Sequence, residues 1–257
     1  MKKYYNFGYT KVNPKQKTKL VQNVFSSVAP NYDIMNDLMS LGMHRLWKKR
    51  FVETVDLKEN EMVLDVGSGS GDIASEILKE NLPTSLYLLD LNEEMLLEGR
   101  KRLKKEKNIK YFIGNAEKLN FENNFFDKYT ISFCLRNVTE YLLSIKEAYR
   151  VLKPGGKYCC LEFSTPKSSL VSSSYRIYKS KILPLLGEIV AKDKNAYKYL
   201  SESIDLFPSQ EELSKNLRDC GFTKVETINL FNGIVAIHTG YKPVSYTHLT
   251  LPTNGLV

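Results

Sequence analysis

Short apolar runs alternate with helical segments through the middle of the chain. Five runs have the length and composition of buried strands, and capped or amphipathic stretches lie between several of them. The strand-like runs are EMVLDV (61–66), SLYLLDL (85–91), the start of KYFIGNAEKL (110–119), FDKYTISFCL (126–135) and KYCCLEFS (157–164). The helical segments are 72–81, 92–108 and 140–153. Strands and helices that alternate in this way form βαβ units, so the pattern predicts an α/β fold with a parallel sheet.

The pattern changes after residue 164. Residues 165–208 are typical of a helical, irregular insertion, and a serine that can cap a helix opens the segment 209–220. Two further strand-like runs within 221–242, GFTKVETINL and GIVAIHTGYK, predict a hairpin. With a lead-in over residues 1–60, these elements predict a single domain over residues 1–243.

Composition and charge narrow the class of protein. The chain has 257 residues, of which 42% are hydrophobic and 26% charged, as in a globular protein. We expect neither a membrane span nor a signal peptide, because the apolar runs are too short and the basic N-terminus has no apolar core behind it. The net charge of +8 lies within residues 1–50, which hold ten Lys/Arg and two acidic residues. A solvated basic arm and an anionic partner both fit this segment.

The cysteines and histidines indicate no metal site. The four cysteines form no C-x-x-C pair, and the three histidines lie far apart. Cys159 and Cys160 are adjacent in a predicted strand, so their side chains should point to opposite faces of the sheet. We expect reduced, structural thiols in a cytosolic type of compartment.

A glycine-rich turn provides the first candidate chemistry. In VLDVGSGSGD, Gly67, Gly69 and Gly71 follow the first strand and allow the backbone to approach a ligand closely. The spacing is G-x-G-x-G rather than the G-x-G-x-x-G of a dinucleotide fold, and Asp65 and Asp72 flank the turn. Acidic residues there suit S-adenosylmethionine (SAM), which is cationic at sulfur and carries no phosphate. A glycine turn without a ligand is the alternative.

Polar positions at the ends of the next strands support the same ligand. Asp90 ends the second strand, where a carboxylate can accept hydrogen bonds from both ribose hydroxyls. Capping of the following helix is its alternative role. Asn115 and Ala116 follow the third strand and could face adenine, and Ser132 lies in the fourth. Because ligands bind at the carboxyl ends of parallel strands, this order predicts a SAM-dependent methyltransferase.

Several longer segments resemble one methyltransferase family. The segments VFSSVAPNYDIMNDLMSLGMHRLWKKRF, VLDVGSGSGD, LDLNEEML, GNAEKLNF, ISFCLRNVTE, YRVLKPGGKYCCLEFS and YKYLSESIDLFPSQEEL are similar to those of the ubiquinone/menaquinone biosynthesis C-methyltransferases, the UbiE type. The resemblance covers roughly residues 6–243. It implies a Rossmann-like class I methyltransferase: a doubly wound, seven-stranded, mostly parallel sheet with its last strand antiparallel, and a helical N-terminal lid.

The resemblance implies a reaction and its partners. The reaction would be SAM-dependent C-methylation of a polyprenyl quinol ring, 2-polyprenyl-6-methoxy-1,4-benzoquinol or demethylmenaquinol, with no metal. A lipid-soluble substrate implies a cytoplasmic enzyme that associates peripherally with the inner face of the membrane. Six lysines of the basic segment could then attract anionic lipid: Lys2, Lys3, Lys11, Lys15, Lys17 and Lys19. A homodimer or a quinone-biosynthesis complex is compatible with this picture.

The resemblance also assigns residues to the SAM site. The family's cofactor contacts fall on Ser70, Asp90, Asn115, Ala116 and Ser132, beside the turn at Gly67. The chain departs from the family at VGSGSG, where AGGTG is frequent, and at Cys134, where glycine is frequent. The first change still allows the turn, and the second narrows the space beside the fourth strand.

Catalytic roles carry over to three positions. Arg136 and Asn137, in the LRN segment, would lie on the substrate side, and Tyr32 would lie in the lid. A guanidinium stays protonated, so Arg136 would stabilise a phenolate or orient a water molecule that accepts the proton. Asn137 and Tyr32 would position that water and the ring. A structural ion pair for Arg136 and helix packing for Tyr32 are the alternatives, and His44 is a candidate base that could equally be a packing residue.

Other functions and the end of the chain complete the predictions. A class I methyltransferase acting on another small soluble substrate shares the SAM motifs, and a non-catalytic SAM-binding scaffold is a further alternative. Aromatic residues between the N-terminal lysines could stack on bases, but no recognition motif supports a nucleic-acid partner. The segment VSYTHLTLPTNGLV (244–257) has no counterpart in the family and is expected to be a non-native extension.

Overall fold

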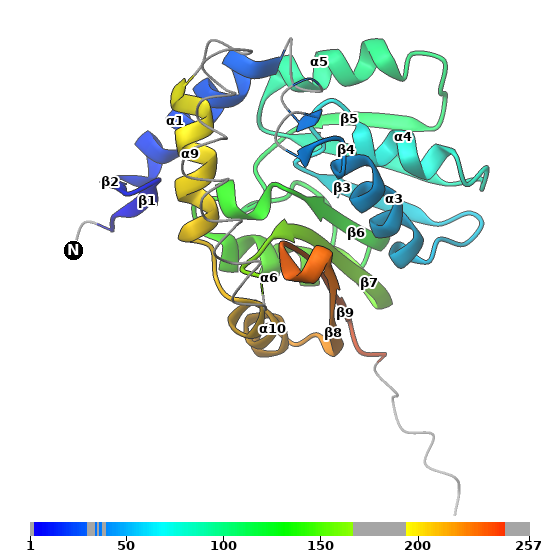
Figure 1. Ribbon diagram of the computed structural model, residues 1–257. Coiled ribbons are helices and arrows are strands. Elements are labelled where there is room, and N and C mark those ends of the chain that lie inside the picture. The colour runs from blue at the N-terminus through cyan, green and yellow to red at the C-terminus, as the bar shows by residue number, and fades with distance from the viewer. Residues whose placement is uncertain (1–2, 30–33, 35, 38–39, 167–193, 245–257) are drawn as a thin grey trace, which may run out of the picture.

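A seven-stranded sheet forms the centre of the computed structural model, which describes residues 3–29, 34, 36–37, 40–166 and 194–244 (Figure 1). The order of its strands is β5-β4-β3-β6-β7-β9-β8. All neighbours are parallel except β9, which runs antiparallel to both β7 and β8. The strands are β3 (Met62–Val66), β4 (Ser85–Asp90), β5 (Ile109–Ile113), β6 (Phe126–Ser132), β7 (Leu152–Phe163), β8 (Thr223–Leu230) and β9 (Val235–Tyr241). The predicted seven-stranded, mostly parallel sheet is confirmed.

Helices cover both faces of this sheet (Figure 1). Two separate groups of buried apolar residues lie on the two sides, as expected of strands that bury both faces. The helices α3 (His44–Val55), α4 (Asp72–Leu78), α5 (Glu93–Arg102) and α9 (Lys194–Asp205) contribute to one group, and α6 (Tyr141–Val151) and α10 (Gln210–Asp219) contribute to the other. Cys159 belongs to the first and Cys160 to the second, so the prediction that they face opposite ways is confirmed.

Two of the helices begin where the sequence predicted a cap. The Asn92 side chain accepts a hydrogen bond from the backbone of Met95 at the start of α5, and Ser209 does the same for Glu212 at the start of α10. Basic residues in the last turn of α5 complement the helix dipole.

The N-terminal segment contains the helices that the sequence predicted for the lead-in, and also two strands that it did not predict. A short hairpin of β1 (Tyr5–Phe7) and β2 (Thr10–Val12) comes before α1 (Pro14–Val28). Residues of α9, distant in sequence, contact this hairpin. The backbone N–H of Tyr9 donates to Glu202, and Phe7 stacks on Tyr199 with ring centroids 4.3 Å apart. Strands this short have little intrinsic preference, so they form because α9 supports them.

The position of Lys17 contradicts the prediction that all six N-terminal lysines could attract anionic lipid. Lys17 belongs to the first turns of α1 and is buried, and its ammonium donates a hydrogen bond to the carbonyl of Val138. Burial lowers its pKa to about 8, against the opposing charge of Glu117. A lysine held in this way cannot face a lipid surface. Lys11, Lys15 and Lys19 are exposed, whereas Lys2 lies outside the described residues.

Two predicted segments lie largely outside the described part of the chain. Of the insertion 165–208, residues 167–193 are not described, and α9 occupies part of the remainder. The expected non-native extension also lies outside, apart from Val244. None of the helices in the described ranges is long and apolar enough to cross a membrane.

Candidate active site

The glycine turn connects β3 to α4 at the carboxyl end of the sheet. Gly67 and Gly71 have φ angles of 64° and 79°, in the region that favours glycine. A Cβ atom on Gly67 would lie 2.1 Å from Cys134 Sγ, so the turn and the end of β6 are in close contact. The expectation that Cys134 narrows the space beside this strand agrees with that contact. Gly99 lets α5 approach the turn equally closely, because its Cβ would lie 3.3 Å from the carbonyl carbon of Ser70.

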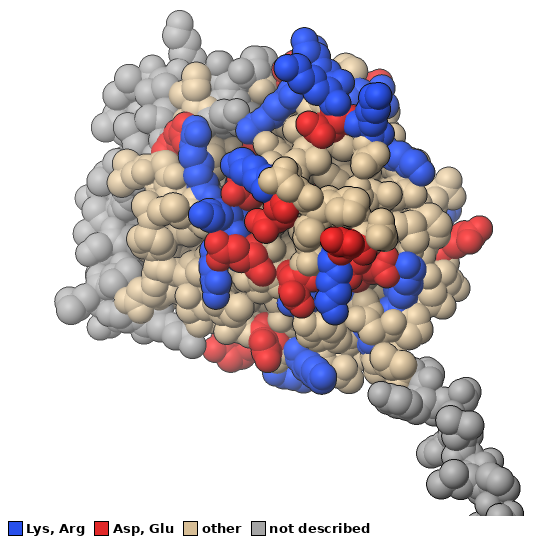
Figure 2. Space-filling model, turned by 90° about the vertical axis from the view of Figure 1, so that its right-hand side faces the viewer, with Lys and Arg blue, Asp and Glu red and all other residues tan. Residues whose placement is uncertain are grey.

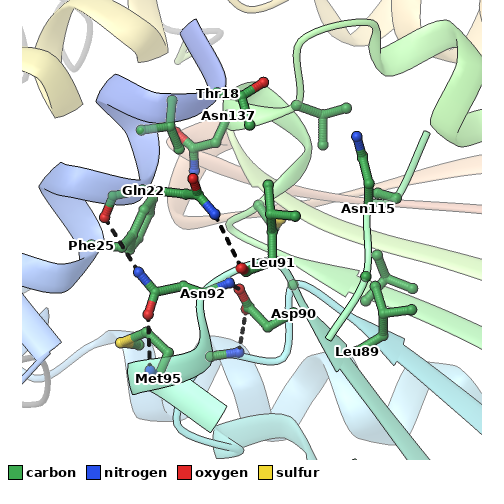
Figure 3. Close-up of a pocket in the computed structure, with 18 of the residues that line it drawn as sticks. Thr18, Gln22, Phe25, Leu89, Asp90, Leu91, Asn92, Met95, Asn115 and Asn137 are labelled. Atoms are coloured by element: carbon green, nitrogen blue, oxygen red, sulfur yellow. Dashed lines mark hydrogen bonds between the residues drawn. The ribbon is translucent and has the colours of Figure 1, made fainter. Parts of the chain in front are cut away.

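A first cavity of about 800 Å³ opens beside this turn (Figure 3). It lies at the point between β3 and β6 where the order of the strands reverses, the position at which ligands bind to such folds. Six of the predicted site residues line it: Gly67, Asp90, Asn115, Ala116, Ser132 and Asn137. Ser70 is buried in the turn and is not among the lining residues.

Asp90 is fixed at the end of β4 by the backbone around it. Its Oδ2 accepts from Gly69 N and its Oδ1 from Asn92 N, both at 2.8 Å. Burial raises the pKa of the carboxyl, and these two hydrogen bonds oppose that shift. The residue that caps α5 is Asn92. Asp90 therefore does not have the capping role that the sequence offered as its alternative. Each carboxylate oxygen keeps a second lone pair that could accept from a ligand hydroxyl.

The charge of the first cavity is negative. Asp90 and Glu117 are the charged residues of its wall, which has no lysine or arginine among the residues that the structure describes. Such a wall favours a cationic ligand over a phosphate. The wall also carries an unused polar group, because Ser132 Oγ is buried with no hydrogen-bond partner among the described residues. These features fit SAM, which offers two cationic centres and polar groups able to meet that hydroxyl.

Asp72 does not contribute to this negative wall. The sequence placed it beside the ligand, but Lys48 and Arg102 bind its two oxygens, and it does not line the cavity. Burial raises the pKa of Asp72, but the two cations outweigh burial and hold that pKa below its ordinary value. The acidic pair in the wall of the first cavity is therefore Asp90 and Glu117, whereas Asp72 connects α3 to α4 through Lys48.

Helix α1 covers the first cavity and supplies residues that sequence reasoning missed. Thr18, Gln22 and Phe25 face the cavity from this helix (Figure 3). Gln22 Nε2 donates to the carbonyl of Leu91 at 3.2 Å, and Asn92 Nδ2 donates back to the Gln22 carbonyl at 3.3 Å. These bonds join positions about seventy residues apart, so the amphipathic pattern of α1 alone could not reveal them.

A second cavity of about 580 Å³ adjoins the first and is lined mainly by apolar and aromatic side chains. Phe25, Phe133 and Asn137 line both, so the cavities meet at these residues. Asn137 Oδ1 accepts from the hydroxyl of Tyr199 at 3.0 Å, and Tyr199, from α9, is a further wall residue that the sequence did not single out. The second cavity thus offers an apolar chamber next to a polar, negative one.

Arg136 lies in the wall of the second cavity as half of a buried ion pair. Its Nη1 lies 2.9 Å from Glu162 Oε2 and donates to the Phe133 carbonyl at 2.7 Å. Burial raises the pKa of Glu162, and the charge of Arg136 opposes that shift. The predicted neighbours Arg136 and Asn137 are therefore brought together beside the chamber, and the ion pair foreseen as an alternative is present. Tyr32 lies outside the described residues.

Comparison with known sequences connects this site to one family. Residues 11–242 match the model of the ubiE/COQ5 methyltransferase family. The ubiquinone/menaquinone biosynthesis C-methyltransferase UbiE of Rickettsia bellii (strain RML369-C) is 48% identical over 244 residues, which cover 92% of this chain and 98% of that protein. The protein of the same name from Rickettsia prowazekii (strain Madrid E) is also 48% identical, with the same coverage.

Comparison with solved structures supports the fold. A SAM-dependent methyltransferase of Thermotoga maritima, described as a possible histamine N-methyltransferase, aligns with a TM-score of 0.61 at 20% identity, over 86% of this chain and 99% of that one. A phosphoethanolamine N-methyltransferase of Haemonchus contortus, solved with S-adenosylhomocysteine, aligns with a TM-score of 0.59 at 18% identity, over 76% and 52%. At these identities the likeness concerns the fold.

Proposed function

The chain belongs to the ubiE/COQ5 methyltransferase family, and on that premise we propose that it methylates a ring carbon of a polyprenyl quinol in ubiquinone or menaquinone biosynthesis, with SAM as the methyl donor. One observation carries the proposal: a negative cavity at the carboxyl end of the sheet adjoins a mainly apolar chamber. The first suits the cationic donor, and the second suits an aromatic ring with an apolar chain.

The proposed cofactor residues contact different parts of SAM. SAM supplies an electrophilic methyl group when it is bound. Asp90 accepts the ribose hydroxyls, Asn115 and Ala116 face the adenine, and Ser132 meets the donor with its unused hydroxyl. The turn at Gly67 and Gly69 brings the backbone close to the ligand without a side chain between them, and Ser70 stays a proposed contact from the same turn.

Residues of the second cavity would orient the quinol. Catalysis requires a ring hydroxyl to lose its proton and the ring to be held in a near-attack position. Arg136 stabilises the phenolate or orients a water molecule, and Asn137, at the junction of the two cavities, positions the ring. Since Glu162 balances the charge of Arg136, the stabilisation comes from the polarity of the pair rather than from a net positive charge. We keep Tyr32 as a proposed part of the lid.

We also propose that the enzyme associates with an anionic membrane surface to reach its substrate. Lys11, Lys15 and Lys19 are exposed near the N-terminus, and each could contribute up to about 1 kcal/mol of attraction to such a surface. Leu41 and Leu46 are 78% and 58% exposed, close in sequence to residues that line the second cavity. Exposed apolar groups and exposed cations are both features of proteins that bind at a lipid interface.

A second basic surface provides the matched control for that proposal. Lys and Arg side chains gather at the top of the face shown in Figure 2, where α5 and the segment after it lie. Replacing Lys11, Lys15 and Lys19 with glutamine should weaken binding to vesicles that contain anionic lipid by at least tenfold, on the order of 1.4 kcal/mol. The same change at Lys101, Lys104 and Lys105 should leave most of the binding. Equal losses in both variants would show that overall charge, not the N-terminal face, governs binding.

A substrate comparison tests the function itself. Purified protein is given SAM with a prenylated quinol or with a soluble phenol of the same ring pattern, and product is followed by mass spectrometry. Methylation of the prenylated quinol alone supports the proposal. Methylation of the soluble phenol alone would favour the alternative of a small soluble substrate, and binding of SAM without any transfer would favour a non-catalytic scaffold.

A further inference from the structure

His44 lies in the wall of the second cavity with one ring nitrogen held by a carboxylate. Its Nε2 lies 2.8 Å from Asp37 Oδ1. Arg45 holds the same carboxylate, with Nε 3.0 Å from Oδ1 and Nη2 2.7 Å from Oδ2. A carboxylate can only accept, so in a neutral ring Nε2 carries the proton and the lone pair resides on Nδ1. The arrangement is that of a base whose tautomer is fixed by an acidic neighbour.

The second ring nitrogen has no assigned role in the fold. Nδ1 of His44 is closed to solvent and has no hydrogen-bond partner among the described residues. The side chain is only 9% exposed. Burying a polar atom without a hydrogen-bond partner costs free energy. Such an atom is therefore a candidate for a role in binding or catalysis.

The charges around His44 keep it neutral near pH 7. Asp37 faces it from the preceding segment, Lys48 from its own helix, and Asp72 from the start of α4. Burial lowers the pKa of His44, Lys48 lowers it further, and Asp37 and Asp72 oppose them. Its pKa therefore lies below the ordinary value of about 6.5, and the ring can accept a proton at neutral pH.

The other strongly basic group in the second cavity cannot take a proton. Arg136 remains charged throughout the accessible pH range and is bound to Glu162. Among the described residues of this wall, His44 has a neutral nitrogen that can accept a proton. The carboxylate of Asp37 beside it can stabilise the protonated ring.

We propose that His44, oriented by Asp37, is the general base that accepts the hydroxyl proton of the quinol. The inference rests on the proposed function and identifies its proton acceptor. The hydroxyl proton passes to Nδ1, which the bound quinol reaches when the side chains that close this atom from solvent give way, and the charge of Asp37 stabilises the imidazolium. The proton that the ring carbon loses after methylation returns to the ring oxygen. The net proton released per turnover therefore leaves from His44 to water.

The first test uses the enzyme without substrate. Nitrogen-15 NMR of the imidazole, with the resonance assigned by comparison with His44→Gln, reports which ring nitrogen carries the proton. We expect a neutral ring at pH 7.5 with the proton on Nε2. A ring that is already protonated at that pH, or one that carries its proton on Nδ1, would overturn the inference.

The second test measures kcat/KM as a function of pH. General-base catalysis is typically worth about 100-fold or more, so His44→Gln should lose at least that factor together with the acidic limb of the profile. Asp37→Asn should move that limb to lower pH, because the imidazolium loses its stabilising charge, and should also lower the plateau. Lys49→Gln, an exposed change on the same helix, is the matched control and should keep the wild-type profile.

The outcomes separate this inference from the function on which it rests. SAM affinity of His44→Gln, measured by calorimetry, should equal that of the wild type, because His44 does not line the first cavity. If the wild type methylates no prenylated quinol, the proposed function fails. If the wild type is active and His44→Gln keeps its acidic limb and most of its rate, the function stands and His44 is not the base.

Discussion

Replacing Arg136 with methionine removes one half of a buried ion pair and leaves the other half intact. The side chains of Arg136 and Glu162 are 6% and 2% exposed, and Nη1 lies 3.0 and 2.9 Å from the two carboxylate oxygens. Breaking such a pair typically costs about 3–5 kcal/mol, because the remaining carboxylate is buried without a balancing charge and keeps only the backbone N–H groups of Arg136 and Phe163 as donors. We expect Arg136→Met to lower the free energy of unfolding by an amount in this range.

The double variant Arg136→Met/Glu162→Gln separates a structural role from a catalytic one. It removes both charges, so it should recover most of the lost stability. Methyl transfer should stay low, because the polar group that the proposal places beside the quinol is still missing. Urea unfolding followed by circular dichroism measures the first quantity, and turnover with a prenylated quinol measures the second.

Two results would refute this reasoning. A loss below about 1 kcal/mol in Arg136→Met would show that the carboxylate finds water or another partner, contrary to the buried site described here. Wild-type turnover in the double variant would show that Arg136 serves the fold alone. The loss in Arg136→Met should also be smaller at pH 5 than at pH 8, because burial favours the protonated form of Glu162.

Three further predictions concern the cofactor turn and a buried histidine. Asp90→Ala should weaken SAM binding about 10- to 100-fold, as expected for lost hydrogen bonds to a charged group, and unaltered affinity by calorimetry would contradict the ribose role. Gly67→Ala should lower the melting temperature and the SAM affinity, because the new Cβ meets Cys134 Sγ. Adding Cys134→Gly to this variant removes the clash and should recover part of the loss. The remaining loss should be about 1–2 kcal/mol, which is the strain of a positive φ angle at alanine. His238 Nε2 donates to the carbonyl of Gln210, and burial lowers the pKa of this histidine to about 4. The unfolded chain therefore binds more protons than the folded one between pH 6.5 and 4. Stability should therefore fall by about 2 kcal/mol from pH 7 to pH 5, and His238→Asn, compared by urea unfolding, should remove this dependence.

The elements that the sequence predicted well are those whose signals are local. The strands from β3 to β7 follow apolar runs, and Asn92 and Ser209 mark helix starts by their own side chains. The positions of Asp90 and Asn115 at strand ends follow directly from the order of these elements. A parallel sheet places such ends at one edge, so the composition of the first cavity could be anticipated.

The elements that the sequence missed depend on contacts between distant segments. The β1–β2 hairpin is supported by Glu202 and Tyr199, and α1 reaches the first cavity through its bonds to the loop after β4. The sequence placed Asp72 beside the ligand because it follows the glycines. In the structure, its carboxylate instead pairs with Lys48 of another helix. No spacing along the chain reports such pairings, because they arise only when the elements pack.

The central claim is that this protein attaches a methyl group to a ring carbon of a prenylated quinol. The most direct measurement supplies SAM with a carbon-13 methyl group and a demethylated polyprenyl quinol, and locates the label in the product by NMR. The account predicts a labelled methyl group on a ring carbon, formed in equal amount with S-adenosylhomocysteine, and its loss in Asp90→Ala under subsaturating SAM. Label on a ring oxygen, or no label in any prenylated product, would contradict it.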